Sequence, residues 1–446
     1  MPPQKIISAI IDHLHSDGSG VFYHEGKSYR IYNTIPQEEI MAKIERKYKG
    51  IWRATLQKIL CASVDRIEPT CPHASICGGC KWQHISYARQ LEEKQQAIKN
   101  TFNNQGLICP LSHILACPSV FYYRNRMDYS FDYKGNLGLK QPGYWWSVIS
   151  LNSCYLLSKD TEKILMSVRK WTHQTGLHFW DAKKHTGFFR SLIIREGKNT
   201  HERLVMLVTT RPENVSLSSV RVIFEELKQI LKPYTHSFVW GINEKQNETS
   251  NPDEIIPING NPWIEEKINN IRYRIYPNSF FQTNSLMAEK LQQTVIDACG
   301  DISGKTILDL YCGAGFFSLA FSKKAKKIIG IEIDDFSIKS ARENAKLNHC
   351  KIDFFSGAVE NFDWQTYKPD LVILDPPRAG LHPHVLKTII QTLPQTIIYI
   401  SCNYRRLVEE LPAFLNTYKL TSLIALDLFP QTPHVEIVAK LELKSL

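Results

Sequence analysis

The sequence predicts an α/β protein that ends in a doubly wound parallel sheet, preceded by a small β-rich unit and a central α+β unit. The chain has 446 residues, which suits two or three domains of about 150 residues each. From residue 277 onward, apolar β-branched runs alternate with helical patterns, as in βαβ units built around a parallel sheet. We expect domains at 1–68, 69–275 and 276–446.

Composition and charge narrow the class of protein. Hydrophobic residues make up 43% of the chain and charged residues 22%, so collagen-like and wholly disordered structures are excluded. No apolar run reaches about 18 residues and no apolar signal segment is visible, so we expect a cytoplasmic protein without membrane association. We also expect no obligate protein partner. Lys and Arg number 54 against 44 Asp and Glu, a surplus compatible with a nucleic-acid partner.

Residues 1–68 are expected to form a small barrel. Short β-favouring runs at Val21–Tyr23 and Tyr29–Tyr32 are separated by glycine-containing turns. The segment Lys43–Arg53 interleaves basic and aromatic side chains, which suits a nucleic-acid platform. A solvated charged strand explains this segment equally well.

The central unit is expected to mix helix and strand. Residues 83–104 are rich in Gln, Glu and Lys and look helical, whereas 243–262 look like a long loop or a hairpin excursion. The strand-like runs are Tyr122–Tyr133, Phe188–Arg195 and Leu204–Thr209.

The C-terminal unit shows the clearest alternation of strands and helices. The expected parallel strands are Thr306–Leu310, Lys327–Glu332, Leu371–Asp375 and Thr396–Ser401. The expected helices between them are Ser337–Asn348 and Pro383–Leu393. The chain is expected to close with a pair of strands at Leu420–Phe429 and Val435–Leu443.

A glycine-rich loop, Asp309–Gly315, follows the first of these strands and precedes a helix. Gly313 and Gly315 let the backbone approach a ligand closely. Glu332 ends the second strand, where an acidic side chain typically accepts hydrogen bonds from ribose hydroxyls. The loop lacks the G-x-G-x-x-G spacing of dinucleotide sites, so we expect S-adenosylmethionine here. A glycine-rich turn in some other α/β domain is the alternative.

Three chemically useful side chains are expected at the carboxyl edge of the same sheet. Asp375 follows one strand, Cys402 follows the next, and Glu436 stands at the start of the last strand. Taken singly, each has a simpler explanation, since cysteine is often a small buried hydrophobe. Their joint placement together with a methyl donor is what indicates chemistry.

These groups meet the requirements for methylating C5 of a uracil. C5 is a poor nucleophile, but a thiolate that adds to C6 turns C5 into an enolate carbon able to attack a methyl sulfonium. A base must then remove the C5 proton so that the thiol can leave. Cys402 and Glu436 supply the nucleophile and the base. Arg378 after the Pro-Pro pair disfavours an amino-group methyltransferase. The distance of the cysteine from that pair disfavours the usual 5-methylcytosine methyltransferases.

The remaining motif is a cysteine cluster. Cys71, Cys77 and Cys80 are spaced C-x5-C-x2-C, and Cys154 is a candidate fourth ligand. Four cysteines suit either tetrahedral zinc or an iron–sulfur cluster, and this spacing is typical of neither zinc sites nor radical enzymes. We interpret the following cysteines as structural or incidental: Cys61, Cys109, Cys117, Cys299 and Cys350.

Taken together, the motifs resemble the RNA (uracil-5-)-methyltransferases, most closely the iron–sulfur, TRAM-containing branch that acts on large-subunit (23S) ribosomal RNA. Besides the motifs above, the matching segments are Asp17–Val21, Arg66–Pro69, Tyr123–Arg126, Phe280–Asn284 and Phe429–Glu436. The resemblance implies a Rossmann-like methyltransferase domain behind an OB-like TRAM barrel and an iron–sulfur domain. It implies ribosomal RNA as the partner and the product 5-methyluridine.

The same resemblance implies roles for individual residues. Cys402 is the expected nucleophile and Glu436 the expected base. The expected S-adenosylmethionine contacts are Gln282, Tyr311, Gly313, Gly315, Glu332 and Asp375. The expected ligands of a [4Fe-4S] cluster are Cys71, Cys77, Cys80 and Cys154.

Three positions depart from the family pattern. Tyr404 stands where the family usually has proline, Phe316 where a relative has asparagine, and Ala358 where a polar residue is frequent. Two alternative functions are also considered for this sequence. The first is uracil-5 methylation of tRNA, which the barrel and cysteine motif are expected to disfavour. The second is a ribosome-assembly factor that binds RNA without methylating it.

Overall fold

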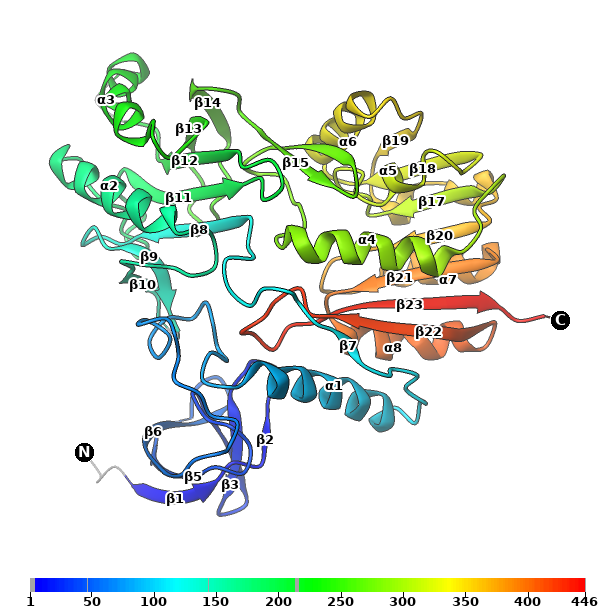
Figure 1. The fold of residues 1–446 in the computed structure, drawn as a ribbon, viewed down its shortest axis with the longest axis horizontal. Coiled ribbons are helices and arrows are strands. Elements are labelled where there is room, and N and C mark those ends of the chain that lie inside the picture. Colours follow the sequence, from blue (N-terminus) through cyan, green and yellow to red (C-terminus); the bar gives the residue numbers. More distant parts are fainter. Residues whose placement is uncertain (1–4, 46, 143, 213–215, 446) are drawn as a thin grey trace.

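The computed structural model describes residues 5–45, 47–142, 144–212 and 216–445. These residues form sheets of six, seven, two and eight strands. Apart from the early strand β7 (Ile114–Leu115) of the eight-stranded sheet, they follow one another along the chain from blue to red in Figure 1. No helix in the described ranges is both long enough and apolar enough to cross a membrane.

The N-terminal unit is a six-stranded sheet in the order β1-β5-β6-β4-β3-β2. Its strands are β1 Ile6–Ile10, β2 His13–Leu14, β3 Gly20–His24, β4 Lys27–Ile31, β5 Glu39–Ile44 and β6 Trp52–Cys61. Both predicted β-runs are therefore confirmed, as β3 and β4. The sheet surrounds a small core that includes Phe22, Tyr29, Ile31 and Ile40.

The central unit is a seven-stranded sheet in the order β10-β9-β8-β11-β12-β13-β14. Its strands are β8 Arg126–Phe131, β9 Leu137–Gln141, β10 Tyr144–Ser150, β11 Phe189–Glu196, β12 Arg203–Thr209, β13 Ser237–Ile242 and β14 Glu254–Asn259. Helices α2 Asp160–Gln174 and α3 Leu217–Leu231 accompany it. Strand β14 pairs antiparallel with β13, so the expected excursion over 243–262 is a hairpin.

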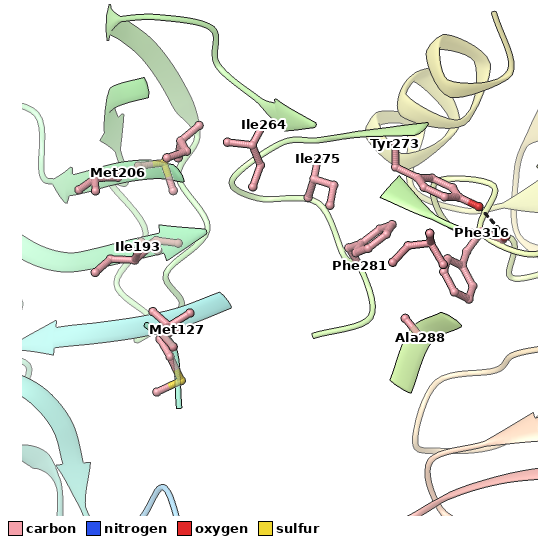
Figure 2. Packing of buried hydrophobic residues seen from close by; sticks show 14 of the residues in the cluster. Met127, Ile193, Met206, Ile264, Tyr273, Ile275, Phe281, Ala288 and Phe316 are labelled. Atoms are coloured by element: carbon pink, nitrogen blue, oxygen red, sulfur yellow. Dashed lines mark hydrogen bonds between the residues drawn. The ribbon is translucent and has the colours of Figure 1, made fainter. Parts of the chain in front are cut away.

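A two-stranded hairpin, β15 Ile264–Ile268 and β16 Ile271–Ile275, joins the central unit to the C-terminal unit. Ile264 and Ile275 lie between the central sheet and the aromatic cluster of Tyr273, Phe281 and Phe316, as Figure 2 shows. Because all of these side chains belong to one continuous buried cluster, the two larger sheets share a core rather than folding around separate ones.

The C-terminal unit is an eight-stranded sheet in the order β19-β18-β17-β20-β21-β23-β22-β7. Its strands are β7 Ile114–Leu115, β17 Thr306–Leu310, β18 Lys327–Glu332, β19 Asp353–Ser356, β20 Leu371–Leu374, β21 Thr396–Ser401, β22 Tyr418–Leu426 and β23 Glu436–Leu443. The four predicted parallel strands and the closing pair are confirmed. The strand order reverses between β17 and β20, which is the point where open α/β sheets bind ligands.

Helices cover both faces of this sheet. They are α4 Ser285–Cys299, α5 Ser318–Phe321, α6 Asp335–Leu347, α7 Pro383–Thr392 and α8 Tyr404–Leu415. Ile307 of β17 packs in a cluster with α4, α5 and α6, whereas its neighbour Leu308 packs in another with α7 and α8. Successive residues of a strand point to opposite faces, so the sheet is doubly wound as predicted.

Two early segments belong to this late sheet. Helix α1, Tyr87–Asn104, buries Ile98 and Phe102 in the same core as α7 and α8. Strand β7 then pairs in parallel with β22 at the sheet edge. Both precede the central sheet in the chain, so part of 69–275 packs with the C-terminal unit, as Figure 1 shows.

Replacing Phe102 tests this placement of α1. The side chain is fully buried, so Phe102→Ala is expected to lower the free energy of unfolding by about 3–5 kcal/mol. Denaturant unfolding measures the change. Ile108, which is 91% exposed just beyond the helix, is the control, and Ile108→Ala is expected to change stability by less than about 0.5 kcal/mol. Equal effects of the two substitutions would contradict the packing of α1.

Candidate active site

The carboxyl ends of the parallel strands meet at one edge of the eight-stranded sheet. Leu310 pairs with Ile331 and Leu374, so Tyr311, Glu332 and Asp375 follow neighbouring strands at that edge. Ser401 of β21 pairs with Ile437 of the antiparallel β23, and this brings Cys402 and Glu436 to the same edge. The sequence-predicted groups of the sheet therefore come together.

The glycine-rich loop after β17 has a constrained backbone. Tyr311, Gly313 and Gly315 have φ angles of 66°, 52° and 82°, a region that non-glycine residues rarely adopt. A Cβ on Gly315 would lie 2.9 Å from Leu319 Cδ1, whereas one on Gly313 would meet nothing within 4 Å. Gly315 is thus required by packing, and Gly313 faces open space where a ligand can approach.

Glu332 is held against this loop by main-chain hydrogen bonds. Gly313 N donates to Glu332 Oε2 at 3.2 Å, and Asp334 N donates to Glu332 Oε1 at 3.0 Å. Each carboxylate oxygen can accept a further hydrogen bond. The arrangement suits hydroxyl groups of a ligand lying over the loop.

Two further carboxyl groups lie close by. Asp309 accepts hydrogen bonds from Ser318 N and Ser318 Oγ through Oδ2, and its buried Oδ1 has no partner among the described residues. Burial raises the pKa of Asp309 to about 7, with a smaller effect from Glu332. Burial and the charges of Asp309 and Glu332 likewise raise the pKa of Asp375 to about 7. A ligand that carries positive charge and hydrogen-bond donors would relieve this crowding.

These carboxylate acceptors therefore fit S-adenosylmethionine, which offers ribose hydroxyls and an ammonium group as donors and carries a sulfonium cation. Asp309 is a residue that sequence reasoning used only to mark the start of the loop. Its signal was a carboxylate at the end of a buried strand, where a purely structural residue would be apolar.

Gln282 lies on a loop that the central unit holds in place. Its side chain is buried, and its main-chain carbonyl accepts a hydrogen bond from Asn125 Nδ2 at 2.8 Å. Asn125 N also donates to Thr283 O at 2.7 Å. The expected central-domain signature around Tyr123–Arg126 thus fixes the backbone of the Gln282 loop.

Two of the three departures from the family pattern, Phe316 and Tyr404, have structural explanations. Phe316 is a buried core residue that packs against Tyr273 and Phe281. Tyr404 is buried as the first residue of α8, a position that also tolerates proline. Ala358 stands at the N-terminus of a short 3₁₀ helix, Val359–Asn361.

Cys402 and Glu436 share a partly buried, negatively charged environment. Burial and the charges of Glu436 and Asp375 raise the pKa of the Cys402 thiol to about 11. Burial and Asp375 also raise the pKa of Glu436 well above its usual value. The Arg378 guanidinium opposes both effects. Arg378 is therefore the cation of this site, although the sequence indicated only which enzyme classes it excludes.

The four cysteines of the predicted cluster line one small pocket. Cys71, Cys77, Cys80 and Cys154 are brought together there from two distant segments. Burial raises the pKa of Cys77 to about 11 and of Cys80 to about 12, although hydrogen bonds involving Gly79 and Gln83 partly oppose it. Arg124 is close enough to lower the pKa values of Cys80 and Cys154. In the described ranges, however, no group of three or more His, Cys, Asp or Glu side chains is arranged to hold a metal ion.

The basic segment of the N-terminal sheet places cations over aromatic rings. Lys27 Nζ lies 4.7 Å from the centre of the Trp52 ring, and the Arg53 guanidinium lies 4.8 Å from that of Tyr48. Tyr48 is half exposed. Exposed rings beside cations are suited to stacking with bases and contacting phosphates.

The influence of Arg378 on the Cys402 thiol can be tested without any substrate. Arg378→Met removes the charge that lowers the pKa of Cys402, so its thiolate becomes scarcer at every pH below about 11. We expect the alkylation rate of Cys402 to fall about threefold and its pH profile to move to higher pH. Mass spectrometry of the Cys402 peptide measures the rate, and exposed Cys61 is the internal reference. An unchanged profile would show that Arg378 does not act on the thiol.

The sequence is similar to those of known RNA methyltransferases. The family described as tRNA (Uracil-5-)-methyltransferase matches residues 260–444. An uncharacterized RNA methyltransferase of Clostridium tetani is 34% identical over 97% of both chains. The tRNA (uracil(54)-C(5))-methyltransferase of Pyrococcus furiosus is 33% identical, over 97% of this chain and 98% of its own.

A solved structure agrees with the whole fold. The crystal structure of Pyrococcus abyssi tRNA (uracil-54, C5)-methyltransferase in complex with S-adenosyl-L-homocysteine matches with a TM-score of 0.81 and 29% identity. The match covers 97% of this chain and 99% of the other. With full-length relatives above 30% identity, the chain belongs to the RNA uracil-5 methyltransferase family, whose members transfer a methyl group from S-adenosylmethionine to C5 of uracil.

Proposed function

We propose that this methyltransferase modifies a uridine of tRNA, with Cys402 as the nucleophile and Glu436 as the base. The observation that carries the proposal is the meeting of Cys402, Glu436 and Asp375 at the carboxyl edge of the sheet. A thiol, a base and a methyl-donor loop at one edge are the parts that C5 methylation requires.

The residues act in a defined order in this proposal. The Cys402 thiolate bonds through Sγ to C6 of the uracil, and the C5=C6 electron pair becomes nucleophilic at C5. C5 then takes the methyl group that S-adenosylmethionine supplies. The donor without this methyl group is S-adenosylhomocysteine. Glu436 accepts the proton from C5, the C5=C6 bond re-forms, and the Cys402 thiolate leaves. The raised pKa of Glu436 makes its carboxylate a stronger base for this step.

Six residues are proposed to hold the methyl donor. Glu332 is suited to ribose hydroxyls, and the open space at Gly313 allows close backbone approach. Asp375 and its neighbour Asp309 are suited to the cationic part of the donor. The proposed contacts are Gln282, Tyr311, Gly313, Gly315, Glu332 and Asp375.

The relatives support a tRNA substrate. The Pyrococcus furiosus and Pyrococcus horikoshii proteins are named tRNA (uracil(54)-C(5))-methyltransferases, and each is similar over 97% of this chain. That span extends over the N-terminal sheet and the cysteine segment, so these features do not argue against tRNA as we expected from the sequence. Large-subunit (23S) ribosomal RNA is the second candidate, because the sequence motifs resemble that branch.

The N-terminal sheet is proposed to contact RNA outside the active site. Its basic and aromatic side chains around Tyr48, Trp52 and Arg53 support this role. The target base must leave its stack to reach Cys402, since chemistry on a base requires it. Binding energy from the sheet would then help to offset the cost of unstacking.

Measurement of the modified nucleoside tests the proposal and separates the substrates. The protein is incubated with S-adenosylmethionine and either unmodified tRNA or large-subunit ribosomal RNA, and the digested nucleosides are read by mass spectrometry. We expect 5-methyluridine in tRNA. Cys402→Ala should still bind donor and RNA but lower turnover by at least about 10³-fold, whereas Cys61→Ala should retain it.

Each other outcome has a definite meaning. Product in ribosomal RNA alone would overturn the tRNA assignment and keep the reaction. Turnover by Cys402→Ala would overturn the nucleophile assignment. No product from either RNA, together with failure to bind S-adenosylmethionine, would favour the ribosome-assembly factor.

We also propose that Cys71, Cys77, Cys80 and Cys154 hold a [4Fe-4S] cluster with a structural role. Four sulfur donors share one pocket, and the nearby Arg124 guanidinium suits the negative charge of a thiolate-bound cluster. Four cysteine ligands leave no iron open for chemistry. Tetrahedral zinc is the alternative for the same donors.

Metal analysis distinguishes these groups. Protein purified without oxygen is expected to contain about four iron atoms per chain and to absorb visible light. Cys80→Ser should lose most of the iron and lower the unfolding temperature, whereas Cys61→Ser, at an exposed thiol, should change neither. Colourless protein with one zinc would overturn the cluster, and protein without bound metal would overturn the ligand set.

A further inference from the structure

The segment between β22 and β23, Asp427–Val435 and called the base loop below, leads directly into Glu436. Leu426 and Glu436 pair across the ladder, so this loop leaves and re-enters the sheet at the active site. The Glu436 side chain is buried, and its carboxyl accepts no hydrogen bond from the residues the structure describes. The position of Glu436 is therefore set by the β22–β23 ladder on one side and by the base loop on the other.

The first anchor of the base loop is a buried ion pair with α1. Lys94 Nζ lies 2.6 Å from Asp427 Oδ1, and both side chains are fully buried. Lys94 Nζ also donates to Phe429 O at 3.2 Å, and Tyr87 OH donates to Asp427 Oδ2 at 2.9 Å. A buried ion pair adds little net stability because both charges are desolvated. Its geometry is nevertheless demanding, so it fixes the start of the base loop against α1.

The second anchor lies in the middle of the base loop. Gln90 of α1 accepts from Gln431 N at 2.9 Å and donates to Gln431 Oε1 at 2.9 Å. Gln431 O accepts from Lys81 N at 2.9 Å and from Trp82 N at 3.0 Å. The φ angle of Gln431 is 67°, which a non-glycine residue adopts only where its surroundings impose it.

We infer that Lys94 and Gln90 are positioning residues for Glu436: through the base loop, α1 sets the place from which the Glu436 carboxyl takes the C5 proton. The inference rests on the proposed roles of Cys402 and Glu436. Neither Lys94 nor Gln90 reaches the reacting atoms. Both act by fixing the backbone that ends at Glu436.

Displacement of Glu436 affects one step of the reaction. Cys402 still adds to C6 and the methyl group still transfers to C5, because neither step uses the base. The C5 proton then stays in place, so the C5=C6 bond does not re-form and the bond from Cys402 to C6 does not break. The expected signature is methylated RNA that remains covalently bound to Cys402.

Lys94→Met tests the inference, because it keeps the length of the side chain and removes its charge. We expect kcat to fall at least about tenfold. KM for RNA should fall with it, because the slowed step follows methyl transfer, so kcat/KM should change less than about twofold. We also expect the covalent complex to accumulate, detected on a denaturing gel with a labelled methyl group. Lys99→Met, at a partly exposed position on the same helix, is the matched control and should behave as wild type.

A second variant guards against simple unfolding. Lys94→Met alone leaves Asp427 charged and buried, which can destabilise the chain. The double variant Lys94→Met/Asp427→Asn removes both charges and should keep an unfolding temperature near that of wild type. It still loses the hydrogen bond to Phe429 O, so it should also accumulate the covalent complex.

Glu436→Gln separates this inference from the proposed function. If Glu436→Gln accumulates the complex while the folded Lys94 variants release product at the wild-type rate, the positioning role is wrong and the base assignment holds. If Glu436→Gln turns over normally, the base assignment fails, and the inference fails with it. Reduced kcat without the covalent complex in the folded Lys94 variants also contradicts the positioning role.

Discussion

The antiparallel insertion of β23 between β21 and β22 is the constraint on which the active site depends. The other neighbour of β21, strand β20, runs parallel to it and has its last residue at the carboxyl edge. Because β23 runs the opposite way, its first residue, Glu436, lies at that edge beside Cys402. A parallel β23 would carry Glu436 to the far side of the sheet. One strand direction thus brings together two residues that are 34 positions apart in the sequence.

The same convergence creates an electrostatic problem. Asp309, Glu332, Asp375 and Glu436 gather at an edge where burial already penalises charge. Burial, together with the charges of Glu436 and Asp375, raises the pKa of Cys402 and so opposes formation of the thiolate that the proposed mechanism requires. Arg378 offsets part of this effect, and a cationic methyl donor would offset more. The site without a bound donor therefore favours the neutral forms of the thiol and the carboxyl groups. A bound sulfonium favours their charged forms.

Much of the C-terminal sheet could be predicted, because its strands are uninterrupted apolar runs whose ends carry polar groups. Contacts between segments that are far apart in the sequence were harder to predict. Strand β7 has two residues, too few for a pattern, and α1 has a largely polar sequence whose lysine at position 94 looks solvated. That Lys94 is buried depends on Asp427, which lies 333 positions away. The role of Arg378 was missed for the same reason: its partners are distant in the sequence. Motifs also pointed to ribosomal RNA, whereas full-length relatives bear tRNA names.

The base loop joins two parts of the protein that the sequence separates. Gln431 is hydrogen-bonded on one side by Gln90 of α1 and on the other by the two residues that directly follow Cys80. Tyr123, which precedes Arg124 beside the cysteine pocket, donates to Pro430 O at 3.1 Å. A group that holds the four cysteines would therefore stabilise the backbone contacts of the base loop without touching substrate. Under the proposed roles of the four cysteines and of Glu436, loss of such a group would slow proton removal before it prevented RNA binding.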